Sequence, residues 1–460
     1  MPRIVKLDPI PVLPDDVSSC GLVITPHQAA AETLRGPHLS LRRIAEEALR
    51  RKNITVASEI QSRSLLKQAV FEADRKTDPA GRATQIRQIL DTLLRTGIDP
   101  EELERFGSQR VKPFARTAAI YKKKLRALGL VDKEEVLFEA AKLTHEPQRL
   151  CIYGYFRARK EEIYFIDAIA GEGSVYFLPC HENAIFTVNR QWAERLEVLG
   201  WTLETEPAVS AKSGSAALRF IGGISDGKSN VRAHYFTEIE AEVRGVLSQI
   251  KELVLEGSVP SNIALVCRKA ELYAPYVAMI AKEYSLPIDF QLKIPLSETR
   301  VGSFVQLVLE SVVDEFPFEI TARLIKHPCG PGLSDDQWAN ARRTHPSGFD
   351  AWTKIGVDLE CLKWSEGDTL HTLIDNLSNA LRRFDVRKVC GFSASESVSF
   401  NCFTDSLAEL KATESDRQIP LQGFAAVIFE LLNSTRTAFD PSAAGVSFYD
   451  PKILIGGRFD

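Results

Sequence analysis

The chain lacks the sequence features of a membrane protein and of a cysteine-bound metal centre. No stretch of its 460 residues approaches the roughly 18 apolar residues that a membrane-spanning helix needs. The N-terminus has no charged segment followed by an apolar one, the pattern of a secretory signal. The eight cysteines stand singly, without a C-x-x-C pair, which argues against a zinc or iron–sulfur site. We therefore expect a cytoplasmic protein with reduced, buried thiols and no membrane partner.

The chain also lacks a strong net charge, but its charges are unevenly distributed. The formal net charge is −4. Residues 1–130 hold 23 Lys and Arg against 15 Asp and Glu, whereas residues 131–460 hold 34 against 46. A basic N-terminal third on an acidic body is typical of a surface that binds a polyanion. The alternative is that these charges only solvate helix surfaces.

Residues 234–297 have the pattern of a parallel α/β unit. Apolar residues recur at helical spacing over 237–254, and Thr237 with Glu240 forms a capping box. A strand-length apolar run at 263–267, a helix over about 271–284 and a second strand at 287–291 follow. This order of helices and strands favours a parallel sheet whose strand ends carry polar residues such as Arg268.

The rest of the chain also alternates between strands and helices. Strands are predicted at 21–25, 149–155, 174–179 and 218–222, with a helix over 191–199, whereas 1–20 is expected to be irregular. Residues 41–145 have an almost wholly helical pattern. Six helices are predicted within 300–445, and short strands at 446–448 and 452–455.

The order of these motifs resembles that of superfamily 1 (UvrD-type) helicases, and most closely the inactivated AddB/RexB/RecC-like branch of recombinational repair nucleases. The spacing E-x-E…EG-x-x-P-x-x-IALVCR…PLS resembles the second motor domain, and IYKKKLRALGLVDKEEVLFEAAKL the helical insert of the first. The resemblance implies an α/β fold with two RecA-like (P-loop helicase-type) parallel-sheet domains, each with a mostly helical insertion. The first would be 1–225, with its insert at about 41–145. The second would be 226–460, incomplete, with its insert at about 301–445.

Several residues match positions at which the family contacts single-stranded DNA. Thr25, His27 and Gln28 stand at a strand end and helix start, where hydroxyl, imidazole and amide groups can hold phosphate oxygens. Ser40 matches the next family motif, as the polar residue before a helix that carries Arg42. A plain strand–turn–helix with a capping threonine explains the same pattern.

Residues 111–126 contain six basic residues and no acid, with Phe114 and Tyr121 interleaved. Such a segment is the best candidate for a surface that follows a phosphate backbone. The alternative is an exposed basic helix face without a ligand. The expected contacts are Lys112, Arg116, Lys122, Lys123 and Lys124.

The residues for ATP hydrolysis are absent from their family positions. No Gly-Lys-Ser/Thr precedes residue 21, and the strand at 149–155 ends in Gly154-Tyr155 where active members carry two magnesium-binding acids. Residues 222–229 (GGISDGKS) satisfy the P-loop pattern, but the following residues favour extended chain instead of a helix. We interpret 222–229 as an inter-domain loop, and Arg268 as a structural ion-pair partner. A nucleotide, if bound, would contact Gly227, Lys228, Ser229 and Arg268.

The resemblance thus implies a non-hydrolysing, helicase-like DNA-binding subunit of a DNA repair and recombination helicase–nuclease (exonuclease) system. Its partners would be single-stranded DNA, or a single/double-strand junction, and a motor or nuclease subunit. No cofactor, metal or catalytic residue is expected. One alternative is an ATPase that uses 222–229. Another is a protein-interaction scaffold, favoured if the basic residues of 111–126 point in several directions. His327 and Cys329 could suggest a metal or a nucleophile, but no third partner is visible in the sequence.

Overall fold

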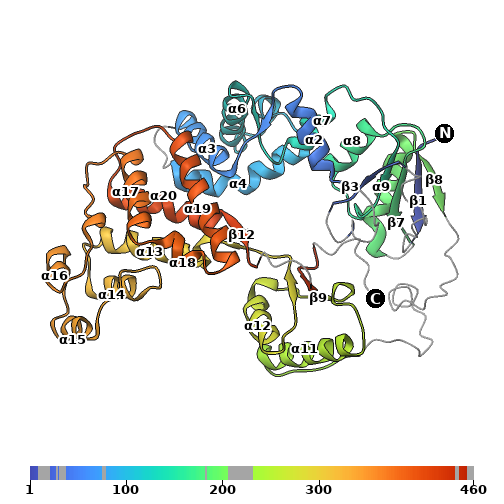
Figure 1. The fold of residues 1–460 in the computed structure, drawn as a ribbon. Coiled ribbons are helices and arrows are strands. Elements are labelled where there is room, and N and C mark those ends of the chain that lie inside the picture. Colours follow the sequence, from blue (N-terminus) through green and yellow to red (C-terminus); the bar gives the residue numbers. More distant parts are fainter. Residues whose placement is uncertain are drawn as a thin grey trace. The chain divides into compact units, whose positions relative to one another are not determined.

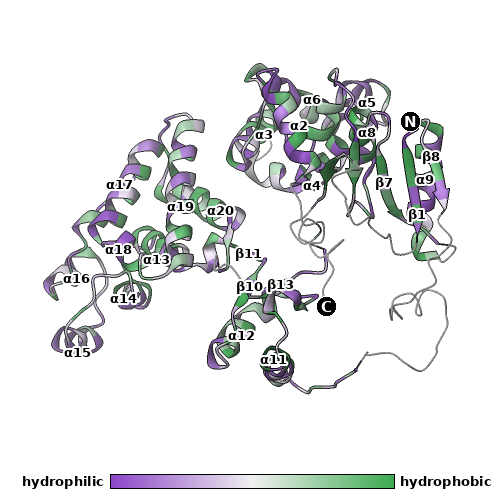
Figure 2. Cartoon of the chain, turned by 45° about the vertical axis from the view of Figure 1, so that its right-hand side comes forward, coloured by the Kyte–Doolittle hydropathy of each residue, from purple (hydrophilic) through white to green (hydrophobic). Residues whose placement is uncertain are grey.

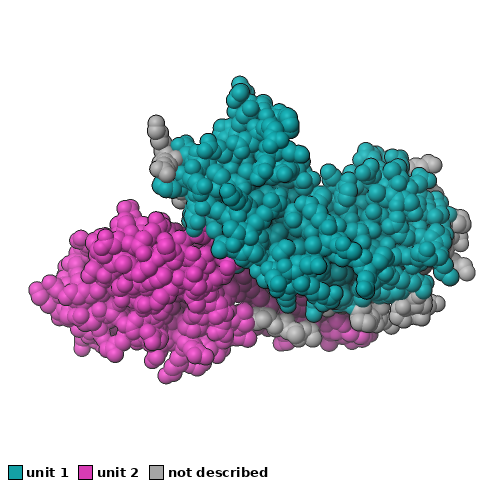
Figure 3. Space-filling view, turned by 90° about the horizontal axis from the view of Figure 1, so that it is seen from above, with its two compact units in different colours: residues 1–58, 65–242, 450–460 teal, residues 59–64, 243–449 magenta. Residues whose placement is uncertain are grey.

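The computed structural model of the chain describes residues 1–8, 21–26, 30, 38–74, 79–181, 184–205, 232–440 and 445–452 (Figure 1). The chain divides into two compact units (Figure 3). Unit 1 comprises Met1–Ser58, Leu65–Glu242 and Asp450–Asp460, and unit 2 comprises Glu59–Ser64 and Val243–Tyr449. Each unit contains a parallel sheet and a set of helices, which makes the fold α/β. None of the helices among the described residues combines the length and the hydrophobicity needed to cross a membrane.

The centre of unit 1 is a six-stranded sheet in the order β3-β2-β6-β7-β1-β8, in which all neighbouring strands run parallel. The residues of β6 and β7 are buried throughout, as expected for a parallel sheet covered on both faces. Helices α2, α7, α8 and α9 pack on it through an apolar cluster. The elements are β1 Ile4–Asp8, β2 Leu22–Ile24, β3 His38–Leu39, α2 Leu41–Arg50, β6 Leu150–Ile152, α7 Val136–Ala141, α8 Lys160–Ile169, β7 Val175–Pro179, the 3-10 helix η2 Ala184–Phe186, α9 Thr187–Val198 and β8 Thr202–Thr205.

Between α2 and β6 the chain forms a helical insertion. Its helices α3, α4 and α6 meet in a separate apolar cluster that includes Leu66, Leu90 and Leu125. Two short strands, β4 and β5, pair in parallel at its base. The elements are β4 Thr55–Val56, α3 Glu59–Ala73, α4 Pro79–Thr96, α5 Pro100–Phe106, α6 Lys112–Ala127 and β5 Leu130–Val131.

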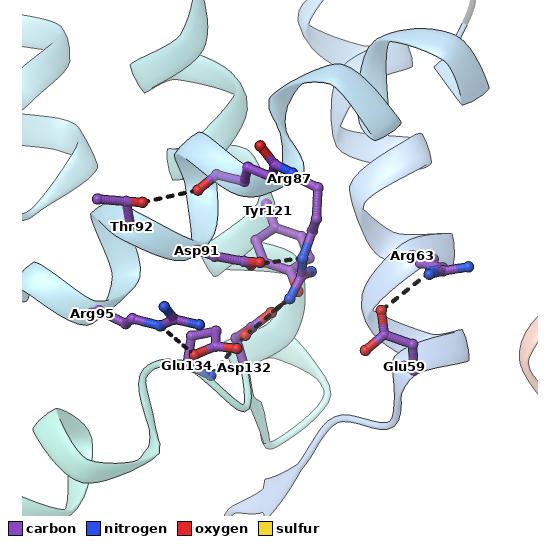
Figure 4. Close-up of polar contacts among 10 residues, drawn as sticks. Glu59, Arg63, Arg87, Asp91, Thr92, Arg95, Tyr121, Asp132 and Glu134 are labelled. Atoms are coloured by element: carbon purple, nitrogen blue, oxygen red, sulfur yellow. Dashed lines mark hydrogen bonds and ion pairs between the residues drawn. The ribbon is translucent and has the colours of Figure 1, made fainter. Parts of the chain in front are cut away.

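A buried polar network joins α4, α6 and the turn after β5 (Figure 4). The carboxylate of Asp132, which is fully buried, accepts hydrogen bonds from the Tyr121 hydroxyl and from Arg87 Nη2, the latter at 3.2 Å. Arg87 also pairs with Asp91 at 2.7 Å. The backbone N–H of Glu134 donates to Asp132 at 2.9 Å. Each of these bonds has a direction, so the network fixes how α4 and α6 meet this turn.

Unit 2 contains a three-stranded parallel sheet in the order β10-β13-β9. The helix–strand–helix–strand order expected for 234–297 is confirmed. However, β9 and β10 do not pair with each other, because β13 from the far end of the chain lies between them. The elements are α11 Ile239–Leu255, the 3-10 helix η3 Pro260–Asn262, β9 Ala264–Val266, α12 Ala270–Glu283, β10 Ile288–Phe290 and β13 Val446–Tyr449.

The second insertion lies between β11 and β12, which pair antiparallel. Its helices pack around one large apolar cluster. Figure 2 shows the contrast between α13, which is mainly apolar, and α15, which is mainly hydrophilic. Most residues of α13 are buried, whereas Ala341 is the one buried residue of α15. The elements are β11 Lys293–Pro295, η4 Leu296–Glu298, α13 Arg300–Val313, α14 Phe318–Lys326, α15 Asp335–Thr344, α16 Phe349–Lys354, η5 Glu360–Leu362, α17 Leu370–Arg383, α18 Val386–Cys390, α19 Ala394–Thr413, α20 Leu421–Ser434 and β12 Arg436–Ala438.

Two parts of the fold differ from the sequence-based expectation. The expectation that 1–20 is irregular is wrong for β1, which is an interior strand between β7 and β8. Strand β8 and helix α8 were not anticipated either. The strand predicted at 218–222, and all but the first residue of the one at 452–455, lie outside the described residues.

Candidate nucleic-acid interface

The carboxyl ends of parallel strands share one edge of a sheet, and α/β proteins bind ligands at this edge. In unit 1, Thr25 follows β2, Ser40 follows β3, and Gly154 lies two residues beyond β6. These three strands are neighbours, and Thr25 N donates to Leu39 O at 3.0 Å. The structure therefore brings these three strand ends together. His27 and Gln28, predicted as their companions, lie outside the described residues.

Two of the three described candidates at this edge have structural partners. The Ser40 hydroxyl caps α2 by accepting a hydrogen bond from Arg43 N at 3.2 Å. Arg42 pairs with Glu46 one helical turn later, at 2.7 Å. Thr25 is almost completely buried, so its side chain is poorly placed to contact a polymer. Ser40 and Arg42 thus have structural partners, whereas the buried Thr25 hydroxyl has no hydrogen-bond partner among the described residues, so the capping role suggested for this threonine is not seen.

The end of β6 has no room for the metal-binding acid of an active motor. Gly154 has φ +89°, and a Cβ there would lie 2.8 Å from Cδ of Pro26. The Tyr155 hydroxyl accepts a hydrogen bond from Leu41 N, the first residue of α2, at 3.0 Å. Burial raises the pKa of Tyr155, so the hydroxyl stays neutral. This strand end holds helix α2 in place.

The basic residues of α6 do not form one exposed face, so the expectation that Lys122, Lys123 and Lys124 lie together is wrong. Consecutive helix residues point about 100° apart. The Lys122 side chain is only 10% exposed and forms an ion pair with Glu135. Lys124 pairs with Glu72 at 2.9 Å. Of the three, only Lys123 is exposed and forms no ion pair with another described residue.

Three cations of α6 do share one side of the helix. Lys112, Arg116 and Lys123 are spaced i, i+4 and i+11, so their directions around the helix axis lie within about 40° of each other. They are exposed or half-exposed, and no ion pair joins them to another described residue. Lys112 and Arg116 line a groove of about 590 Å³ together with Arg82 of α4. We call Lys112, Arg116 and Lys123 the α6 stripe.

Acidic residues limit the positive charge of this surface. Glu104 of α5 lines the groove beside Lys112 and also a second groove, of about 400 Å³, beside Lys123. Asp74 lines the first groove, and Glu101 lines the second. The α6 stripe is therefore a line of separate cations and not a continuous basic patch, which favours a few phosphate contacts over tight electrostatic binding.

An exposed aromatic ring lies at the end of α5. Phe106 is 79% exposed, and the guanidinium of Arg105 lies 5.9 Å from its ring centre. Arg105 also lines the groove that contains Lys123. Exposed aromatic rings beside cations are the usual stacking surfaces for single-stranded bases. The signal in the sequence is an aromatic residue that ends a short, otherwise charged helix, PEELERF.

The aromatic residues predicted to stack on bases are core residues instead. Tyr121 is completely buried, with its hydroxyl bound to Asp132. Phe114 packs partly buried against the apolar cluster of the insertion. Amphipathic helices place their apolar residues between the polar ones along the sequence, so interleaving alone does not separate stacking residues from core residues.

Of the four nucleotide candidates, the structure describes only Arg268. Gly227, Lys228 and Ser229 lie outside the described residues. Arg268 follows β9 in unit 2 and is exposed, with no ion pair to any described residue, so its interpretation as a structural ion-pair partner is not supported. Within the described ranges, no three His, Cys, Asp or Glu side chains are grouped so that they could hold a metal ion.

Comparison with known proteins does not identify a relative. No family model matches the chain, and no curated protein matches it. The function must therefore be argued from the geometry of the two units and from the motifs in the sequence.

Proposed function

We propose that the chain is a non-hydrolysing, helicase-like subunit of the AddB/RexB/RecC-like kind, which binds single-stranded DNA beside a motor or nuclease partner in DNA repair. The observation that carries the proposal is the sheet of unit 1. In it, all neighbouring strands run parallel and β7 lies between β1 and β6, which is compatible with the parallel-sheet motor domain that the resemblance implies. Yet neither β1 nor β6 leads into residues suited to nucleotide hydrolysis.

The sequence after β1 is unsuited to binding phosphate. A P-loop needs glycines, which let backbone amides approach the phosphates, and a lysine that contacts them. Residues 9–20 (PIPVLPDDVSSC) contain no glycine, lysine or arginine, and they include two aspartates. Negative charge at this position would repel a nucleotide. At β6, Pro26 occupies the space that a side chain at residue 154 would need.

The architecture of unit 2 also supports the proposal. Its parallel sheet is interrupted between β10 and β13 by the long helical insertion, as the resemblance implies for a second motor-like domain. Binding of DNA itself is supported by the α6 stripe and by Phe106, because together they offer cations for phosphates and a ring for a base.

The test is a salt titration of binding to fluorescent single-stranded DNA, with and without Mg-ATP. Replacing all three stripe residues (Lys112→Gln, Arg116→Gln, Lys123→Gln) should weaken binding at low salt about tenfold or more. It should also reduce the slope of log K against log salt by about 2, since each single-strand phosphate contact contributes about 0.7. Phe106→Ala should weaken binding without changing this slope, because stacking releases no counterions.

Lys124→Gln is the matched control, because it removes one positive charge from the same helix. That charge already pairs with Glu72. It should leave both affinity and slope nearly unchanged. If the triple variant binds like the parent chain, the α6 stripe is not the interface. ATP-dependent binding that disappears in Lys228→Ala would instead support the ATPase alternative.

A protein-interaction scaffold is the second candidate function. The observation that favours it is the orientation of Lys122 and Lys124, which point away from the stripe into ion pairs with Glu135 and Glu72. A scaffold would bind no DNA at any salt concentration, so the same titration separates it from the proposed function.

A further inference from the structure

A small cavity lies where the first helical insertion meets the sheet part of unit 1. Its volume is about 330 Å³, and it is lined by residues of α6 and β5 in the insertion and of α7, which packs on the sheet. The apolar part of its wall is formed by Ile54, Leu125, Leu130 and Val131. Pockets for small molecules begin at about 300 Å³ and are lined mainly by apolar side chains with a few polar groups. This cavity has the size and the wall of a site for a small ligand.

A buried ion pair forms another part of the wall. Lys122 of α6 pairs with Glu135, the residue before α7, and both line the cavity. Lys122 is 8% exposed and Glu135 is 4% exposed. Burial raises the pKa of Glu135, and the nearby Lys122 opposes that shift. A buried charge pair is costly to desolvate, and a titratable group beside a charge partner in a cleft is typical of a functional site.

The charges around the cavity favour a negatively charged ligand. Glu139 of α7 is engaged by Lys142, whose Nζ lies 2.6 Å from its carboxylate, and Glu135 is engaged by Lys122. The Lys122 ammonium has three N–H donors, but Glu135 is its one ion-pair partner among the described residues. Arg126 also lines the cavity, is exposed, and forms no ion pair with another described residue. Both acids are therefore neutralised, whereas the two cations still have donors to offer.

We propose that this cavity binds a small carboxylate with an apolar body, which carries one aromatic ring or a medium-length alkyl chain. The carboxylate pairs with Arg126 at the exposed side of the cavity, since arginine holds carboxylates through two parallel hydrogen bonds. Lys122 donates a further hydrogen bond. The apolar body lies against Leu125, Leu130 and Val131.

The site does not depend on the α6 stripe. Consecutive helix residues point about 100° apart, so Lys122 and Leu125 lie on a different side of α6 from the stripe. The ligand contacts both the insertion and α7, and it binds only the folded chain. Its binding should therefore stabilise unit 1 against unfolding.

The experiment titrates the full chain with hydrocinnamate in ligand-observed NMR, with the amide of the same acid as the uncharged ligand of the same shape. The acid should bind about tenfold more tightly than the amide, because hydrogen bonds between charged groups are stronger than those to a neutral group. Hydrocinnamate should also move the urea transition of unit 1 to higher denaturant and leave that of unit 2 in place.

Two variants locate the site. Arg126→Gln should weaken the binding of hydrocinnamate about tenfold, to the level of the amide. Leu130→Trp should abolish binding of both ligands, because the larger side chain fills the cavity. Arg110→Gln is the matched control, since Arg110 is also exposed and forms no ion pair with a described residue, but does not line the cavity. It should bind hydrocinnamate like the parent chain.

Absence of binding, or equal affinities for the acid and the amide, would overturn the proposal. An Arg126→Gln variant that binds like the parent chain would do the same, and it decides the question even if Leu130→Trp folds poorly, because Arg126 is exposed. Displacement of hydrocinnamate by single-stranded DNA would also contradict the proposal, since it would place the acid on the α6 stripe. The triple variant of the stripe should still bind the acid, so the two proposals are tested separately.

Discussion

The two helical insertions of this chain are held together in different ways. In unit 1 the insertion has, beside its apolar cluster, a directional network in which Asp132 binds Arg87 and Tyr121. In unit 2 the insertion closes around an apolar cluster that contains Trp352 and Phe403, both fully buried. The strands at their bases differ as well, since β4 and β5 pair in parallel whereas β11 and β12 pair antiparallel.

This difference concerns geometry as well as stability. Apolar contacts are non-directional and tolerate small shifts, whereas a network of charged hydrogen bonds holds only when each donor faces its acceptor. The α6 stripe belongs to the insertion with the directional network, and Tyr121 of that network lies on α6 itself. Unit 1 thus fixes the rotation of the helix that carries its exposed cations.

The largest expected effect is that of removing the centre of the network. Asp132→Ala would remove the carboxylate that accepts from the buried Tyr121 hydroxyl and that pairs with the buried Arg87 guanidinium. Breaking a buried ion pair from one side costs about 3–5 kcal/mol. We expect urea denaturation, followed by circular dichroism, to show this loss in the transition of unit 1 and little change in that of unit 2.

Glu47→Ala in α2 is the control for this variant. It also breaks a carboxylate–arginine pair in unit 1, but the pair with Arg51 is exposed on both sides. Exposed pairs contribute less than about 1 kcal/mol. If Asp132→Ala and Glu47→Ala destabilised the chain equally, the network would not hold the first insertion together.

The second largest effect is expected from a substitution in the apolar cluster of unit 2. Leu377 of α17 is fully buried in the cluster of unit 2. Leu377→Ala should lower the free energy of unfolding by about 3 kcal/mol, because it removes apolar contacts and leaves a cavity. The same urea titration should show this loss in unit 2. A larger loss in unit 1 would contradict the assignment of the two cores.

Sequence patterns predicted best those elements whose apolar residues are continuous or periodic. Strand β7 and helix α12 were anticipated within a residue or two. Strands β1 and β8 were missed because IVKLD and TLET carry Lys6 and Glu204 in short runs, so that hydrophobicity alone does not identify them. Their place in the sheet depends on pairing with distant strands, which local propensity does not encode.

The candidate site was predicted less well than the fold. A basic segment at 111–126 was correctly placed on a helix, but the count of its charges gave no information about which cations pair with distant acids. Lys122 meets Glu135 and Lys124 meets Glu72 only after the helices pack. Phe106 was overlooked because one exposed aromatic residue resembles any other apolar residue in a sequence.

The smallest expected effect, and the one that separates the units most cleanly, is the dependence of stability on pH. In unit 1, burial raises the pKa of Asp91, Glu135 and Glu162 above their ordinary values of 3.8 and 4.5. Two other carboxyl groups of unit 1 have lowered pKa values: Lys124 lowers that of Glu72, and Arg95 outweighs the effect of burial on that of Glu134. Above their ordinary pKa values, the three groups with raised pKa values hold more protons in the folded unit than in the unfolded one. Its stability therefore falls as the pH rises through the raised pKa values, and acidification from pH 7 to about 4.5 should increase it.

In unit 2 the pKa shifts of carboxyl groups run the other way. A hydrogen bond from Arg383 lowers the pKa of Asp358, one from the backbone of His371 lowers that of Asp416, and one from Arg244 lowers that of Glu283. Stability from such groups is fully present above their ordinary pKa values. It is lost only as the pH falls through the lowered ones, so these groups leave unit 2 unchanged between pH 7 and 4.5.

Urea titrations at several pH values between 7 and 4.5 should therefore move only the transition of unit 1 to higher denaturant, by on the order of 1 kcal/mol in total. Glu162→Gln should make this rise shallower, because glutamine keeps an acceptor for Arg159 N but cannot take up the proton. Parallel shifts of both transitions would contradict the comparison, because they would mean that the same kind of carboxyl group governs the two units.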